Sequence, residues 1–369
     1  MRKINLQRLR YLLAFLLLNS TVIFAQTKKQ VRFFPAPFVF YTPETRWGGG
    51  VGATYFFTSK EKLHPNDTIT RLSNLNVSSL VTQNKQFLAD IIWNAFTYQN
   101  KYYHRGVVDF GKYVEYFYGI GPNININKGE FYDYSRFFII NRSLKKMNDF
   151  WYLGVYGQFF KTYGIAARIP DGILNTLNPV GKGGSSVLGV GITAFYDSRD
   201  NRFSATKGSF FDVISATYQP FLGSTHAYNY LKIDARHFAH NKNAKIVFAN
   251  QVVTELNFGS VPFNRLSNIG GQEIGRGYVQ GAYRDKSTIQ AQTELRFLVY
   301  KIVYGATFVS SSKLFSDANA LLINDLKWAY GGGVRVMFNK ERRLSLRVDA
   351  AFTPASSKPR FYLGINEAF

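Results

Sequence analysis

The strongest constraint on this chain is a regular alternation of apolar and polar side chains within short segments. Every second residue from Leu344 to Phe352 is apolar, and the polar residues Ser345, Arg347 and Asp349 stand between them. Successive side chains of a β-strand point to opposite faces, so this segment has one apolar and one polar face. An apolar outside and a charged inside are typical of a transmembrane β-barrel.

The amino-acid composition agrees with this fold. Aromatic residues make up 17% of the chain, as expected for the girdles at the two membrane interfaces of a barrel. The chain has no cysteine, so the closed ladder of backbone hydrogen bonds must hold the barrel without disulfides. We therefore predict an all-β fold, a transmembrane antiparallel β-barrel of about 16 strands, an even number as in bacterial barrels.

The N-terminal region predicts export. Basic residues among the first ten precede an apolar core at Tyr11–Leu18, and Ile23–Ala25 offers a cleavage site. This core is shorter than the ~20 residues of a spanning helix, and the pattern is that of a secretory signal peptide. We expect residues 1–25 to be the signal peptide and residues 26–369 to form one barrel in the bacterial outer membrane.

One connection is too long for a hairpin turn. It contains the glycine-dense segment Gly270–Asp285 and joins the strands expected at Ile246–Phe258 and Thr288–Tyr300. Glycine permits backbone angles and close approaches that other residues do not. We predict a long loop between strands 11 and 12 that folds into the lumen.

The first strand, expected at Val31–Tyr41, contains two prolines, which cannot donate to a ladder. In a closed barrel this strand meets the last one, expected at Arg360–Phe369, so the sequence predicts a weak lateral seam between them. A strand that starts only at Phe38 is an equally good interpretation. The residues assigned to the lateral seam are Pro35, Pro37, Gly364 and Phe369.

The formal net charge of +22 could indicate nucleic-acid binding. The basic residues are spread over strands and loops, however, so lumen walls and contacts with outer-membrane lipid and lipopolysaccharide explain them better. We expect no nucleic-acid partner and no cofactor. The charges predicted to face the lumen are Lys232, Asp234, Arg236, Arg296, Arg335, Arg347 and Asp349.

Four motifs in residues 186–369 resemble those of the bacterial surface antigen barrel family, which includes BamA, TamA and the two-partner secretion transporters. The first is Arg276-Gly277-Tyr278 in the long loop. The others are the turn Tyr196–Asn201 followed by Gly208, the run Tyr330–Arg335 and the terminal Gly364–Phe369. Each motif alone is weak, whereas four in this order are specific.

The resemblance implies that the loop arginine enters the lumen and meets acidic residues on the next two strands. Glu294 stands at the matching place on the first of these strands, and Ser310 replaces the usual aspartate on the second. A buried arginine needs such partners, so Glu294 should carry most of the contact with Arg276. Relatives usually carry periplasmic POTRA domains, and this chain is expected to be a barrel-only, POTRA-less member.

Three functions fit these features. The resemblance implies insertion, assembly or translocation of proteins, or of lipids, through the lateral seam, with client outer-membrane proteins or a separate periplasmic subunit as partners. A basic lumen would also suit a passive, anion-favouring channel or a loop-plugged structural barrel. Arg276 and Glu294 pin the loop in either case.

A hydrolase is the third alternative, and it needs a nucleophile beside a positioned base. His237 and His240 are three residues apart, which places their rings on opposite faces of a strand; His226 and Asp234 do not converge with them. His64 and His104 have no acidic or serine neighbour in sequence. We therefore predict no enzyme and no metal site.

Overall fold

The computed structural model describes residues 32–42, 45–57, 73–98, 100–316, 325–340 and 343–369. The predicted signal peptide, residues 1–25, and His64 lie outside these residues. Among the described residues no helix has the length and apolar character needed to cross a membrane.

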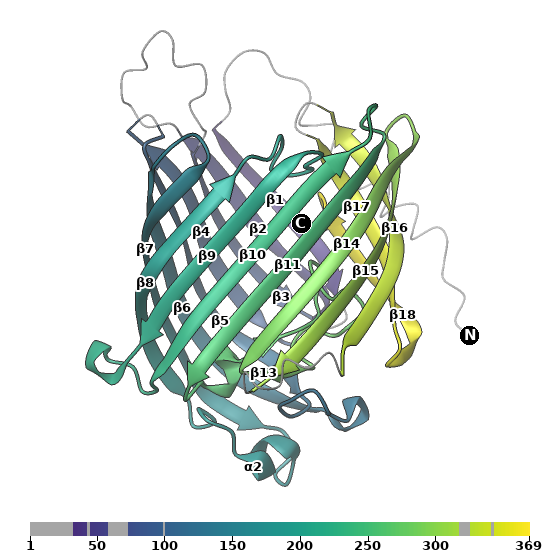
Figure 1. Cartoon of the computed structure of the whole chain (residues 1–369). Coiled ribbons are helices and arrows are strands. Elements are labelled where there is room, and N and C mark those ends of the chain that lie inside the picture. The colour runs from purple at the N-terminus through teal and green to yellow at the C-terminus, as the bar shows by residue number, and fades with distance from the viewer. Residues whose placement is uncertain (1–31, 43–44, 58–72, 99, 317–324, 341–342) are drawn as a thin grey trace.

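The wall is one 16-stranded antiparallel sheet that curves into a barrel (Figure 1), and the predicted all-β fold is confirmed. Each strand pairs with its sequence neighbour, except that β11 pairs with β14 because the two-residue strands β12 (Ser267–Asn268) and β13 (Arg284–Asp285) form a separate pair within the long loop. The strands of the wall are β1 (Phe33–Thr42), β2 (Arg46–Phe57), β3 (Ser73–Thr82), β4 (Phe87–Thr97), β5 (Tyr102–Phe117), β6 (Glu130–Lys146), β7 (Trp151–Ala167), β8 (Ser185–Asp197), β9 (Gly208–Tyr218), β10 (Tyr228–His240), β11 (Ile246–Gly259), β14 (Ser287–Tyr300), β15 (Val303–Phe315), β16 (Lys327–Asn339), β17 (Leu344–Thr353) and β18 (Ser356–Ile365).

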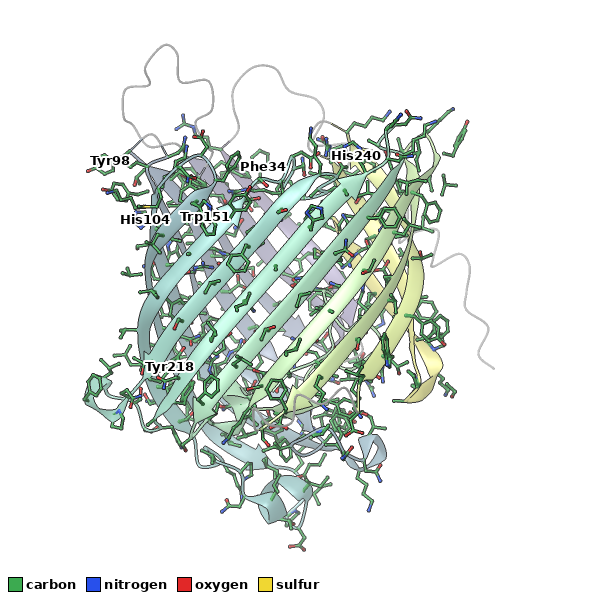
Figure 2. All side chains as sticks on the ribbon, in the orientation of Figure 1. Phe34, Tyr98, His104, Trp151, Tyr218 and His240 are labelled. Carbon is green, nitrogen blue, oxygen red and sulfur yellow. The ribbon has the colours of Figure 1, made fainter. Side chains whose placement is uncertain are left out.

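Side chains alternate between the two faces of the wall as the sequence pattern predicts. On β17, Leu346 and Val348 are exposed on the outer face, whereas Arg347 and Asp349 are buried inside. Exposed aromatic side chains, among them Tyr98 and Trp151, lie near one rim (Figure 2). In the part of the chain that the structure describes, helical structure is confined to connections, such as α2 (Ile173–Leu177) between β7 and β8.

Aromatic side chains fill one side of the lumen. On the side formed by β5 to β10 its wall carries stacked aromatic rings, including Tyr218 over Tyr228 with 4.2 Å between ring centroids. The long loop, residues 260–286, adds Phe263, whose ring lies 5.6 Å from that of Phe117. Sequence alternation predicts a charged interior, whereas the structure shows that the half of the wall formed by β5 to β10 is aromatic inside. Tyrosine suits this aromatic half, because it can bury its ring and still hydrogen-bond through its hydroxyl.

The barrel closes least well between β1 and β18. These strands are neighbours, but in the described part of the chain no ladder joins them. The carbonyl oxygen of Arg32 accepts a hydrogen bond from Phe56 N–H at 2.7 Å. Because bonded pairs alternate along an antiparallel ladder, the even-numbered residues of β1 bond to β2, and the odd-numbered ones face β18. Pro35 and Pro37 are odd-numbered and offer no N–H to that edge.

The two ends of the wall differ from the sequence-based expectation. β1 already begins at Phe33, so a strand that starts only at Phe38 is wrong. β18 ends at Ile365 rather than at the last residue, and Asn366 adopts φ +66°. The C-terminal tail, residues 366–369, then enters the lumen, where the ring centroid of Phe369 lies 6.1 Å from that of Phe238.

Phe369 is therefore not part of the lateral seam, and this assignment is corrected. Its apolar character continues the alternation of the last strand, but Glu367 forms ion pairs with lumen arginines. These contacts draw the tail away from the wall.

Candidate functional site

The long loop is anchored by one buried guanidinium. Arg276 has no exposed side-chain surface; its Nη2 lies 2.6 Å from Oε2 of Glu294 on β14, and its Nη1 lies 2.7 Å from Oδ2 of Asp349 on β17. The guanidinium also lies over the ring of Phe308 on β15, with 3.5 Å from Cζ to the ring centroid. A planar fork that meets two carboxylates and an aromatic face uses the features that distinguish arginine from lysine.

The residues beside Arg276 set its position. Gly277 has φ +107°, and a Cβ there would lie 2.8 Å from Cγ2 of Thr353, so glycine is required for this approach to β17. The N–H of Gly277 donates to the hydroxyl of Tyr362 at 2.9 Å. The hydroxyl of Tyr278 donates to the carbonyl oxygen of Trp328 at 3.0 Å. The motif thus contacts β16, β17 and β18.

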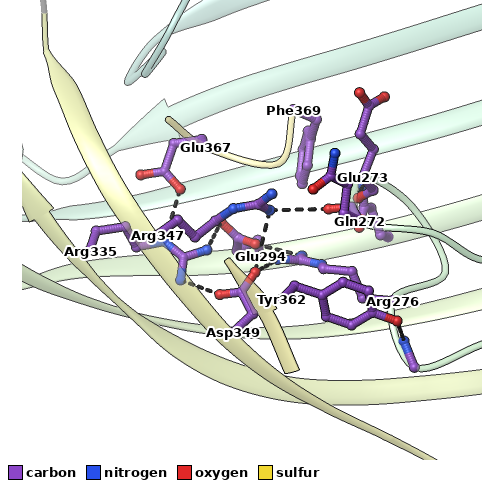
Figure 3. A network of polar contacts seen from close by, with 12 residues as sticks. Gln272, Glu273, Arg276, Glu294, Arg335, Arg347, Asp349, Tyr362, Glu367 and Phe369 are labelled. Carbon is purple, nitrogen blue, oxygen red and sulfur yellow. Dashed lines mark hydrogen bonds and ion pairs between the residues drawn. The ribbon is translucent and has the colours of Figure 1, made fainter. Parts of the chain in front are cut away.

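Around this anchor lies a buried network of charged side chains, part of which Figure 3 shows. Arg335 on β16 donates to Asp349 at 2.6 Å and to Glu367 of the C-terminal tail at 3.0 Å. Arg296 on β14 donates to Glu294 at 2.8 Å. The members of the charged network are Arg276, Arg296, Arg335, Arg347, Glu294, Asp349 and Glu367. Each buried charge has an opposite partner, which offsets its desolvation cost.

Glu294 meets Arg276 as the resemblance implies, but the second partner differs from the expectation. No hydrogen bond between Ser310 and Arg276 occurs among the described residues; Ser310 is buried on β15, and Phe308 of that strand contacts the guanidinium instead. The second carboxylate comes from Asp349, two strands further on. The alternation of β17 predicts that Asp349 faces the lumen, but it does not predict the contact of Asp349 with Arg276.

Two further arginines of the long loop contact the wall, and the sequence analysis did not predict them. Nη2 of Arg265 donates to Oε1 of Gln158 on β7 at 2.8 Å, and its guanidinium lies over the ring of Phe160. Nη2 of Arg284 donates to the carbonyl oxygen of Tyr116 at 3.4 Å. The loop is therefore held against the aromatic half of the wall as well as against β14 to β18. Nothing in the local sequence distinguishes these arginines from solvated ones.

The other charges predicted to face the lumen form smaller pairs on β10 and β11. Lys232 lies 2.9 Å from Glu255, and Arg236 lies 2.6 Å from Asp234. They are inside the barrel, and these pairs are separate from the charged network.

The turn after β8, residues 198–207, is held by hydrogen bonds of its side chains to the backbone and to other side chains. Nε of Arg199 donates to Asp197 at 2.9 Å, and Oδ1 of Asn201 accepts the N–H of Phe203 at 2.8 Å. Asp200 accepts from the N–H of Thr206 and lies 2.6 Å from Nη1 of Arg343 in the turn between β16 and β17. Burial alone would raise the pKa of Asp200, but these hydrogen bonds lower it to about 2.

The four histidines of the described residues lie apart from one another and from Asp234. His237 is exposed, and its Nδ1 lies 2.9 Å from Oγ of Ser209. Asp234 points into the lumen, on the opposite face of β10 from this pair. His226 contacts Thr225, and His104 contacts Ser143 on β6. Among the described residues no group of three or more acidic or histidine side chains could hold a metal ion.

Comparisons with known proteins give one family and several solved structures of similar fold. The Omp85 superfamily domain matches residues 39–369. A comparison with curated proteins finds no match. Among solved structures, BamA from Haemophilus ducreyi lacking POTRA domains 1–3 is similar, with a TM-score of 0.61 and 12% identity over 92% of this chain and 71% of that one.

Two structures of CdiB are also similar. CdiB from Acinetobacter baumannii has a TM-score of 0.54 and 12% identity, and CdiB from Escherichia coli has a TM-score of 0.59 and 9% identity. Each match covers 92% of this chain but only 60% and 62% of the two CdiB chains. At these identities the likeness establishes the fold alone.

Proposed function

Because the chain belongs to the Omp85 superfamily and forms a barrel of the outer membrane, we propose that it inserts or translocates proteins there through the lateral seam between β1 and β18. Clients would be other outer-membrane proteins, delivered by a separate periplasmic subunit. The same opening would also suit lipids.

The observation that carries this proposal is the free edge of β1. Pro35 and Pro37 remove two donors from the side that faces β18, and no ladder joins these strands in the described residues. An open strand edge can pair with another strand by main-chain hydrogen bonds. A client strand could therefore add to the edge of β18 or β1 without first breaking a complete ladder.

The loop and the tail support a lateral route rather than a route along the barrel axis. Both enter the lumen and are held there by the charged network, including the pair Arg276–Glu294 and the pair Arg335–Glu367. The arginines that would make the lumen selective for anions already bind carboxylates. Single-channel recordings in planar bilayers should therefore show a mostly closed barrel; a steady, anion-selective conductance would favour the passive channel.

Disulfide crosslinking tests the seam directly, because the chain has no cysteine of its own. One variant carries Val39→Cys and Leu363→Cys, which would join β1 to β18. The matched control carries Val348→Cys and Leu363→Cys, because Val348 and Leu363 are register partners on β17 and β18. Both are assayed for client insertion in cells, with and without reductant.

We expect the seam crosslink to abolish insertion reversibly and the control crosslink to leave it unchanged. Full activity of a folded barrel with its seam crosslinked would refute a lateral route. Loss of activity in both variants would mean that the assay responds to crosslinking in general.

A further inference from the structure

A groove opens on the outer face of the wall where β11 and β14 separate. Their pairing stops at Glu255 and Thr288, whereas β11 continues to Gly259 against β10. Beyond that point side chains replace the ladder: Oγ of Ser287 accepts the N–H of Asn257 at 3.3 Å. The gap leaves a hollow of about 350 Å³.

The lining of this groove is mainly apolar. Leu256 and Phe258 come from β11, Ile289 comes from β14 and Phe315 comes from β15. On β11 the even-numbered residues share the outer face with the exposed side chain of Phe248. The groove therefore faces the bilayer and not the lumen. An apolar hollow holds water poorly, so in a membrane a lipid chain is its natural occupant.

Two lysines supply charge beside the groove. Lys286 lines it directly, and Lys313 is the register partner of Ile289 on β15, which places it on the same outer face. Oδ1 of the buried Asp285 accepts the backbone N–H of Lys286 at 2.7 Å. Basic residues at the membrane surface attract anionic lipid.

We propose that this groove binds one anionic phospholipid, with an acyl chain between β11 and β14 and its headgroup phosphate on Lys286 and Lys313. The bound lipid bridges both stems of the long loop. The stems touch here through Asn257, whose Nδ2 donates to the carbonyl oxygen of Lys286 at 2.7 Å. Lipid binding thus stabilises the loop where the ladder is missing, and it does not depend on the proposed lateral route.

Native mass spectrometry of the delipidated full chain tests this site. Phosphatidylglycerol and phosphatidylcholine with the same acyl chains are titrated separately. The test variant is Lys286→Gln with Lys313→Gln. The control is Lys245→Gln with Lys301→Gln, which removes the same charge at the other ends of β11 and β14. A third variant, Ile289→Trp, fills the groove without a change in charge.

We expect one retained phosphatidylglycerol, weakened about tenfold in the test variant and unchanged in the control. Ile289→Trp should lower retention of the lipid, and phosphatidylglycerol should raise the unfolding temperature of the wild type more than that of the test variant. Equal retention of the two lipids, or unchanged binding in the test variant or in Ile289→Trp, would overturn the site. A dimer that Ile289→Trp abolishes would assign the groove to a second copy of the chain.

Discussion

Arg335 joins the C-terminal tail to the loop anchor. Its Nε donates to Glu367 at 3.0 Å, and its Nη1 donates to Asp349 at 2.6 Å, the carboxylate that also binds Arg276. The last residues of the chain and the tip of the long loop thus share one buried network. Because the tail follows directly on β18, a change in this network would act on β18, which forms one edge of the lateral seam.

Removal of the tail's charge should weaken the barrel. Glu367→Gln leaves Arg335 and Arg296 with one fewer carboxylate in a buried place, so we expect a loss of about 3 kcal/mol in unfolding free energy. Asp149→Asn is the control, because its ion pair with Lys146 is on the surface and should contribute little. Urea unfolding of the folded barrel in detergent measures both, and equal stability of Glu367→Gln and wild type would contradict the prediction.

Arg276→Lys should release the loop although it keeps the charge. A lysine ammonium cannot meet Glu294 and Asp349 with a planar fork, and we expect about 3 kcal/mol of destabilisation. Limited proteolysis should then cut within residues 260–286 of a barrel that is still folded. A double-mutant cycle with Asp349→Asn should be strongly non-additive, because the two residues are in contact; additive effects would mean that the pair is not coupled.

Gly277→Ala should destabilise the loop through its backbone. The residue has φ +107°, and the new Cβ would lie 2.8 Å from Thr353, so we expect a cost of about 1–3 kcal/mol. Gly157→Ala on β7 is the matched control, since a Cβ there meets nothing within 4 Å. Thermal unfolding that shifts equally in both variants would show that loss of glycine, and not the tight approach, is responsible.

The contribution of Asp200 to the free energy of unfolding should depend on pH. Its pKa is about 2 in the folded chain against 3.8 for the free group, so the ionised form favours folding. This contribution is complete above about pH 4 and is lost as the pH falls towards 2. Asp200→Asn should lack this dependence, so the difference in melting temperature between wild type and variant should shrink over that range. A constant difference from pH 6 to pH 2 would contradict the assignment.

The sequence alone determined the barrel, its strand number and the place of the long loop. These depend on local properties, because a period of two assigns each side chain to a face, and glycine density marks a segment that must fold tightly. Arg276 and Glu294 could be named in advance because a motif and a neighbouring strand carry them.

Only the tertiary structure of the barrel determines which inward-facing groups meet. Asp349 lies 73 residues from Arg276, and Arg265 reaches Gln158 across 107 residues of sequence. Such contacts depend on strand tilt and stagger, which alternation does not encode. Phe369 shows the same limit, because its alternation fits a strand, yet the ion pair between Glu367 and Arg335 draws the tail into the lumen. An ion pair between residues far apart in the sequence there outweighs the local alternation of apolar and polar residues.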